Sequence, residues 1–116
     1  MEKLLALATP PTAIFCYNDM SAIGALSRIR AHGLRVPDDI SLVGFDDLFV
    51  ASYVDPPLTT VRQPKQPMGN MAMEIMLKLL SEGHHETIIR MQGELIVRGS
   101  TAPPRNKLQV DVPPAD

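Results

Sequence analysis

Two adjacent carboxylates, Asp46 and Asp47, directly follow an almost continuous apolar run at residues 40–45. Such a run is typical of a strand buried in a parallel sheet. A second polar pair, Asn18 and Asp19, follows an earlier apolar run in a similar way. Because open α/β sheets bind ligands outside the carboxyl ends of their strands, this spacing predicts a ligand-binding mouth at Asp46.

Catalysis and metal binding are the other chemistries that these residue types allow. Adjacent residues at the end of a strand point apart, which disfavours a catalytic acid–base pair, and we expect Asp47 to cap the following turn instead. His84 and His85 come directly after Gly83, where a helix is expected to end, so an exposed turn is favoured over metal ligation. We therefore expect no enzyme activity, no catalytic residue, no metal and no cofactor.

The composition sets further bounds on function. The chain has 116 residues and a net charge of −2, which is the size of one domain at most and gives no basic footprint for nucleic acid. The single cysteine, Cys16, lies in an apolar run and is expected to be a buried small hydrophobe. No stretch reaches the length of a membrane span, so we expect a cytoplasmic protein without membrane contact.

The elements that must position these polar residues alternate between strand and helix. Strands that are continuously apolar predict an α/β fold with a parallel sheet covered on both faces. Glycines at 33 and 83 are expected to end the two main helices. In chain order we expect a strand at 13–16, a helix at 20–32, a strand at 40–45, an extended segment at 58–63, a helix at 67–80, strands at 87–91 and 94–98, and a weakly packed tail from 101 onward.

Several longer stretches resemble the C-terminal part of the effector-sensing domain of LacI/GalR-type bacterial transcription regulators. They occur in the family's order and span nearly everything from residue 10 to residue 101. The matching pieces are P-T-A-I-F-C-Y-N-D-M-S-A-I-G-A-L (11–26), G-L-R-V-P-D-D-I-S-L-V-G-F-D-D (33–47), P-P-L-T-T-V-R-Q-P (56–64), M-G (68–69) and L-I-V-R-G-S-T (95–101).

The resemblance implies an incomplete periplasmic-binding-protein-like (type I) fold, in which two α/β lobes enclose an effector cleft. It assigns 1–101 to a partial effector-sensing domain and 102–116 to a Pro-rich tail. Within the domain, 4–63 belong to the C-terminal lobe, 64–91 to a segment of the N-terminal lobe, and 93–101 to the return into the C-terminal lobe. A DNA-binding head and most of the N-terminal lobe are expected to lie outside this chain.

The resemblance also implies which residues bind a sugar or a related metabolite. These effector contacts map to Asn18 or its neighbour Asp19, to Asp46 and to Gln63, with Asp46 accepting from a sugar hydroxyl or a base nitrogen. A homodimer surface maps to Met20, Ile23, Ser27, Phe49, Ser52 and Tyr53.

The implied function is the effector-binding and dimerising portion of a DNA-binding repressor. Two alternatives stay open: part of a transporter's sugar-binding protein, or a truncated module that self-associates without sensing. The apolar stripe of the helix at 67–80 lacks most of its expected partner sheet. We expect the chain to dimerise or to exchange this helix between protomers, or else to fold the helix back onto its own lobe.

Overall fold

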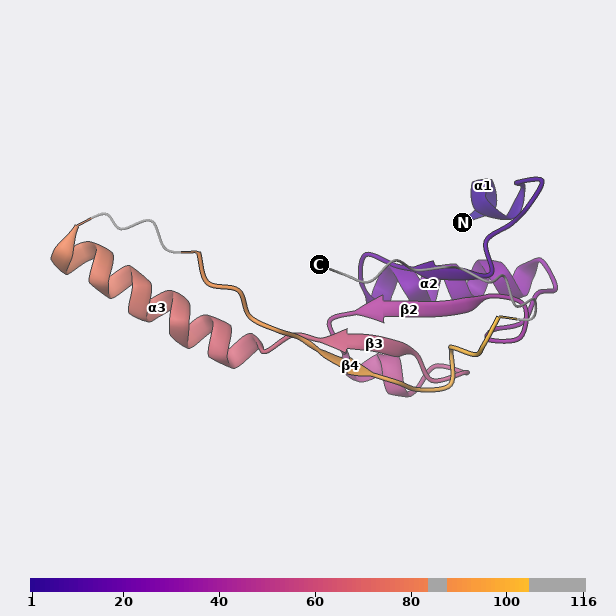
Figure 1. Cartoon of the computed structure of the whole chain (residues 1–116). Coiled ribbons are helices and arrows are strands. Elements are labelled where there is room, and N and C mark those ends of the chain that lie inside the picture. Colours follow the sequence, from indigo (N-terminus) through magenta and orange to yellow (C-terminus); the bar gives the residue numbers. More distant parts are fainter. Residues whose placement is uncertain (84–87, 105–116) are drawn as a thin grey trace.

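The computed structural model describes residues 1–83 and 88–104 (Figure 1). The described chain contains a four-stranded sheet, three α-helices and one short 3-10 helix. In chain order the elements are α1 (Glu2–Leu5), β1 (Ala13–Phe15), α2 (Asp19–Ala31), β2 (Ser41–Phe45), η1 (Phe49–Ser52), β3 (Thr59–Arg62), α3 (Lys65–Glu82) and β4 (Glu94–Ile96).

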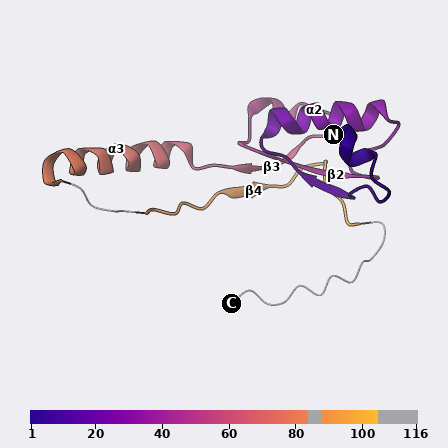
Figure 2. The ribbon, with the colours of Figure 1, turned by 90° about the horizontal axis from the view of Figure 1, so that it is seen from above.

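The sheet has the strand order β1-β2-β3-β4. β1 pairs with β2 and β2 with β3 in parallel, whereas β4 is antiparallel to β3. α2 lies along one face of the sheet (Figure 2). The predicted α/β class is thus confirmed, with a sheet that is mostly parallel where a parallel one was predicted. Between helix and sheet lies an aliphatic core of Cys16, Ala22, Ala25, Leu26, Ile29, Ile40, Leu42, Ala51 and Leu58.

Local chemistry sets the ends of the helices, and the two glycines act as the sequence predicts. Asn18 is the N-cap of α2, and its Oδ1 accepts a 2.8 Å hydrogen bond from the backbone N–H of Ser21. Gly33 follows α2 with a φ of 72°, and Gly83 ends α3 with a φ of 86°. Both angles lie in the left-handed region, where a side chain is costly, and this explains why glycine ends each helix.

α3 projects away from the sheet and has no buried residue (Figures 1 and 2). The radius of gyration is 18.7 Å, against about 13 Å for a compact domain of this length. The expectation that this helix folds back onto its own lobe is therefore wrong. Large apolar side chains such as Leu77 and Leu80 are 59% and 78% exposed on it. No helix in the described residues is long and apolar enough to cross a membrane.

The strand expected at 87–91 is absent from residues 88–91, and Thr87 lies outside the described residues. A strand needs a hydrogen-bonded neighbour, and no described strand pairs with residues 88–91. β4 begins at Glu94 as predicted but ends at Ile96. The amide of Arg98 leaves the ladder and donates to the Thr59 hydroxyl at 2.9 Å.

The chain is well packed directly before the predicted tail. Ser100 is buried, and its hydroxyl donates to the backbone oxygen of Leu42 at 2.5 Å and accepts from the amide of Thr59 at 2.8 Å. The amide of Ala102 donates to the Ser41 hydroxyl at 3.1 Å. Within the predicted tail, residues 102–104 are exposed, as weak packing implies, and residues 105–116 lie outside the described residues.

Candidate functional site

Asp46 and Gln63 come together at the carboxyl edge of the sheet. Asp46 follows the last residue of β2, and Gln63 follows the last residue of β3. Since these strands are parallel neighbours, their carboxyl ends meet, and the Gln63 side-chain amide donates a short hydrogen bond to Oδ1 of Asp46. The ammonium group of Lys65 donates to the backbone oxygen of Asp46 at 2.9 Å.

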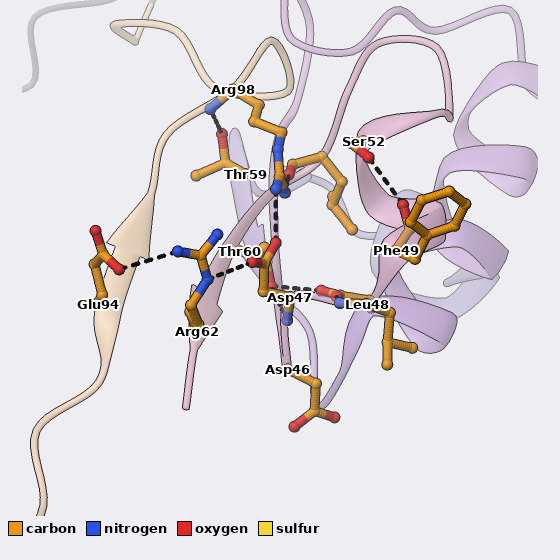
Figure 3. Close-up of polar contacts among 12 residues, drawn as sticks. Asp46, Asp47, Leu48, Phe49, Ser52, Thr59, Thr60, Arg62, Glu94 and Arg98 are labelled. Atoms are coloured by element: carbon orange, nitrogen blue, oxygen red, sulfur yellow. Dashed lines mark hydrogen bonds and ion pairs between the residues drawn. The ribbon is translucent and has the colours of Figure 1, made fainter. Parts of the chain in front are cut away.

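The second carboxylate oxygen of Asp46, Oδ2, makes no hydrogen bond within the described residues. The side chain of Asp46 is partly exposed and points away from the arginines beside the neighbouring Asp47 (Figure 3). An ionised carboxylate only accepts hydrogen bonds, and each oxygen accepts more than one. Asp46 can therefore accept from a hydroxyl or N–H group of a ligand while Gln63 holds its other oxygen.

A groove of about 500 Å³ opens beside this pair, between the sheet edge and α3. Gln63 supplies the polar side chain of its lining, and the rest is apolar. Small-molecule sites combine apolar walls with a few placed polar groups, and Gln63, which is hydrogen-bonded to Asp46, supplies such a group here. The lining consists of Phe45, Val61, Gln63, Pro64, Met68, Met71, Ala72, Ile75, Ile89, Met91 and Gly93.

Asn18 and Asp19, the other expected effector contacts, have roles in the fold. The Oδ1 atom of Asn18 caps α2, and no described hydrogen bond joins this side chain to Asp46 or Gln63. Asp19 is fully buried. Its Oδ1 accepts from the Thr60 hydroxyl at 2.5 Å and its Oδ2 from the amide of Leu48 at 2.6 Å. With no exposed surface and both oxygens engaged, Asp19 is unsuited to contact an effector.

Asp47 does not cap the following turn, contrary to expectation. Its carboxylate lies between two arginines, with Oδ1 2.6 Å from Nη2 of Arg98 and Oδ2 2.7 Å from Nε of Arg62 (Figure 3). Burial by itself would raise the pKa of Asp47, but hydrogen bonds and charge from Arg98 and Arg62 outweigh it and hold this pKa below its ordinary value. The carboxylate therefore stays ionised at neutral pH.

Sequence reasoning missed the two arginines and Thr60. Arg62 and Thr60 are two positions apart on β3, which places them on the same face of the sheet. That alternation is a signal that was present in the sequence. Arg98 carried no such signal, because it reaches Asp47 from 51 positions away along the chain.

Cys16 is buried, as its apolar run predicts, and burial raises the pKa of its thiol. A thiol with a raised pKa is a poor nucleophile, which fits a packing role. His84 and His85, for which an exposed turn is expected, lie outside the described residues.

The expected dimer surface is a set of side chains on α2 and η1. Met20, Phe49 and Tyr53 are 58%, 81% and 70% exposed, and Ile23 is partly exposed. The rings of Phe49 and Tyr53 lie 4.6 Å apart between centroids. Ser27 and Ser52 are exposed as well, and the hydroxyl of Ser52 donates to the backbone oxygen of Phe49 at 2.8 Å.

Comparison with known proteins matches residues 1–101 to the periplasmic binding protein-like domain. The repressor PurR of Aliivibrio salmonicida is 46% identical over 101 residues, which are 86% of this chain and 30% of that protein. The repressor CytR of Escherichia coli is 46% identical over 87% of this chain and 30% of its own length. The chain thus spans just under a third of the curated relatives it matches.

Solved structures give the same result. A LacI family regulator from Bifidobacterium animalis has a TM-score of 0.80 at 35% identity, with 89% of this chain and 38% of that chain covered. The lac repressor dimer bound to operator and the anti-inducer ONPF has a TM-score of 0.73 at 35% identity, covering 80% and 32%. The complex of the regulator CelR with cellobiose has a TM-score of 0.70 at 34% identity, covering 77% and 28%.

The chain belongs to the periplasmic binding protein-like domain family, in the form found in the effector-binding domains of LacI-type regulators. The resemblance to these regulators that the sequence motifs indicated is confirmed. The curated relatives named here are transcriptional repressors rather than enzymes.

Proposed function

We propose that this chain is the effector-binding and dimerising portion of a LacI-type transcriptional regulator that works in the cytoplasm. The observation that carries the proposal is the hydrogen-bonded Asp46–Gln63 pair at the carboxyl edge of a parallel sheet, with Gln63 in the lining of an apolar groove. This position is where open α/β sheets bind ligands. Contact with DNA would be made by another part of the regulator.

The proposed effector is a sugar or a related small metabolite that offers a hydroxyl or N–H group to Asp46. The similarity to a regulator solved with cellobiose supports a sugar. A sugar hydroxyl suits this acceptor, because hydrogen bonds to an ionised carboxylate are stronger than those between neutral groups. Gln63 fixes the orientation of Asp46, and Asn18 at the adjacent strand end is the third proposed contact.

Titration of the ¹⁵N-labelled chain with neutral sugars, cellobiose among them, and with purine bases tests this site by NMR. The side-chain amide of Gln63 gives its own signal beside the amide of Asp46, so the pair reports directly. We expect one class of compound to shift both signals. Asp46→Asn should weaken the affinity for that compound about tenfold to a hundredfold, because a hydrogen bond to a charged group contributes about 1.5–3 kcal/mol.

Asp38→Asn is the matched control for this titration. It makes the same chemical change in the loop before β2, at the opposite edge of the sheet, and should leave the response unchanged. If no compound shifts the Gln63 and Asp46 signals, or if Asp46→Asn responds like the original chain, the binding proposal is wrong.

The dimerising role is proposed for the exposed surface on α2 and η1 described above. The similarity to the lac repressor dimer supports it. The double variant Phe49→Ser and Tyr53→Ser should self-associate more weakly than the original chain, as measured by sedimentation. An unchanged association constant would remove this surface from the proposed interface.

A further inference from the structure

The loop that presents Asp46 has an unusual backbone. Asp46 has a φ of 101° and Asp47 a φ of 48°, and these are the only described residues other than glycine with a positive φ. Side chains clash with the backbone in this region, so each such residue persists only where its surroundings hold it. Two in succession, directly at the candidate ligand contact, call for a physical cause.

Three successive amides of this loop are held by three different acceptors. The amide of Asp46 donates to the backbone oxygen of Val61 at 2.9 Å. The amide of Asp47 donates to the Thr60 hydroxyl at 3.3 Å, and that of Leu48 to Oδ2 of the buried Asp19 at 2.6 Å. These bonds fix where the loop runs, but they leave the side chain of Asp47 unspecified.

The Asp47 side chain is held by the arginine contacts described above. It is 9% exposed and its partner Arg98 is 19% exposed, so water screens this pair little. Arg98 is anchored in turn, because its Nη1 donates to the backbone oxygen of Leu58 at 2.8 Å. Arg62 is 52% exposed, and its 3.3 Å pair with Glu94 lies at the surface, where ion pairs contribute little. Arg98 is therefore the stronger partner.

The two adjacent acids consequently divide two tasks. Asp47 points back between the arginines, and Asp46 points away from them (Figure 3). We propose that Asp47 is a positioning residue: clamped by Arg98 and Arg62, it holds the left-handed turn that aims the Asp46 carboxylate outward. This inference rests on the proposed function only in taking Asp46 as the ligand contact.

The test uses the full 116-residue chain without any ligand. The three-bond coupling between the amide and α protons reports φ at Asp46 and Asp47, and hydrogen exchange reports the amides of residues 46–48. In Asp47→Asn we expect both couplings to move toward averaged values, and exchange at 46–48 to speed up about tenfold. The amide of Cys16, bonded to Val43 at 2.8 Å in the sheet, serves as the reference for global opening.

Two further variants keep the test decisive. Asp47→Glu restores the negative charge and should recover part of the protection. If Asp47→Asn does not fold, Arg62→Gln takes its place in the test, because it changes a half-exposed partner of Asp47. This variant should loosen the turn in the same direction, but less strongly. If exchange at 46–48 follows the Cys16 amide and both couplings stay unchanged, Asp47 only stabilises the fold and the positioning role is wrong. No ligand is involved, so this outcome is separate from failure of the effector titration.

Discussion

The Thr60 hydroxyl donates a 2.5 Å hydrogen bond to the buried carboxylate of Asp19, which joins the middle of β3 to the first residue of α2. The other oxygen of Asp19 accepts from the amide of Leu48 beyond the end of β2. One carboxylate thus ties a helix, a strand and the site loop together. Each of its two oxygens accepts a hydrogen bond, as buried polar groups require.

Thr60→Val should lower the free energy of unfolding by about 1.5–3 kcal/mol, because it leaves a buried carboxylate oxygen without its donor. Chemical denaturation measures this change. The double variant with Asp19→Asn should show a non-additive loss, since the two side chains are in direct contact. Strictly additive losses would mean that the hydrogen bond contributes nothing of its own.

Gly44→Ala should destabilise the chain by about 1–3 kcal/mol. A methyl group there would overlap Oδ1 of Asp19 and approach Cδ2 of Leu58 to 2.9 Å. Gly24→Ala is the matched control: it lies within α2 with nothing within 4 Å of the new carbon, and should stabilise by about 0.5–1 kcal/mol. Thermal unfolding of both variants checks the opposite signs, and the prediction fails if Gly44→Ala is neutral.

Protonation of Asp47 should lower the stability of the chain in acid. Its folded pKa lies below the ordinary 3.8, so its contribution to stability is present above that value and is lost as the pH falls through the folded pKa. Urea midpoints measured from neutral pH into acid should fall less steeply in Asp47→Asn than in the original chain. Asp38→Asn, which breaks an exposed 3.2 Å pair with Arg35, should leave the slope unchanged.

α3 should drive self-association of the chain. Leaving Met76 and Leu80 in water forfeits about 1.5–3 kcal/mol for each large side chain, and a patch of this size favours association. Light scattering after size exclusion should give a mass above that of the monomer. Met76→Lys with Leu80→Lys should lower that mass.

The control for α3 adds the same two positive charges on the polar side of the helix, as Asn70→Lys with Ser81→Lys. It should associate like the original chain. A monomeric original chain at the same concentration would contradict the expected helix exchange between protomers.

Residue patterns predicted much of the local structure. Gly33 and Gly83 end helices because only glycine adopts their left-handed φ cheaply, and Asn18 caps α2 because its short side chain reaches a free amide. Gln63 was indicated as an effector contact only by the resemblance to LacI-type regulators, and its hydrogen bond to Asp46 is a finding of the structure. The helix ends needed only the residues and their spacing.

Long-range packing decided the rest. Asp19 was interchangeable with Asn18 as an expected effector contact, and the fold buries it against Thr60. Asp47 was expected to cap a turn, but Arg98 approaches it from 51 positions away and binds its carboxylate. Residues 88–91 have strand-like composition but no described partner strand, and α3 has the expected stripe but no cover. The sequence alone determined which segments are helical or extended, because those preferences are local. Only the tertiary structure decided which carboxylate faces a ligand, because that depends on which distant groups occupy the others.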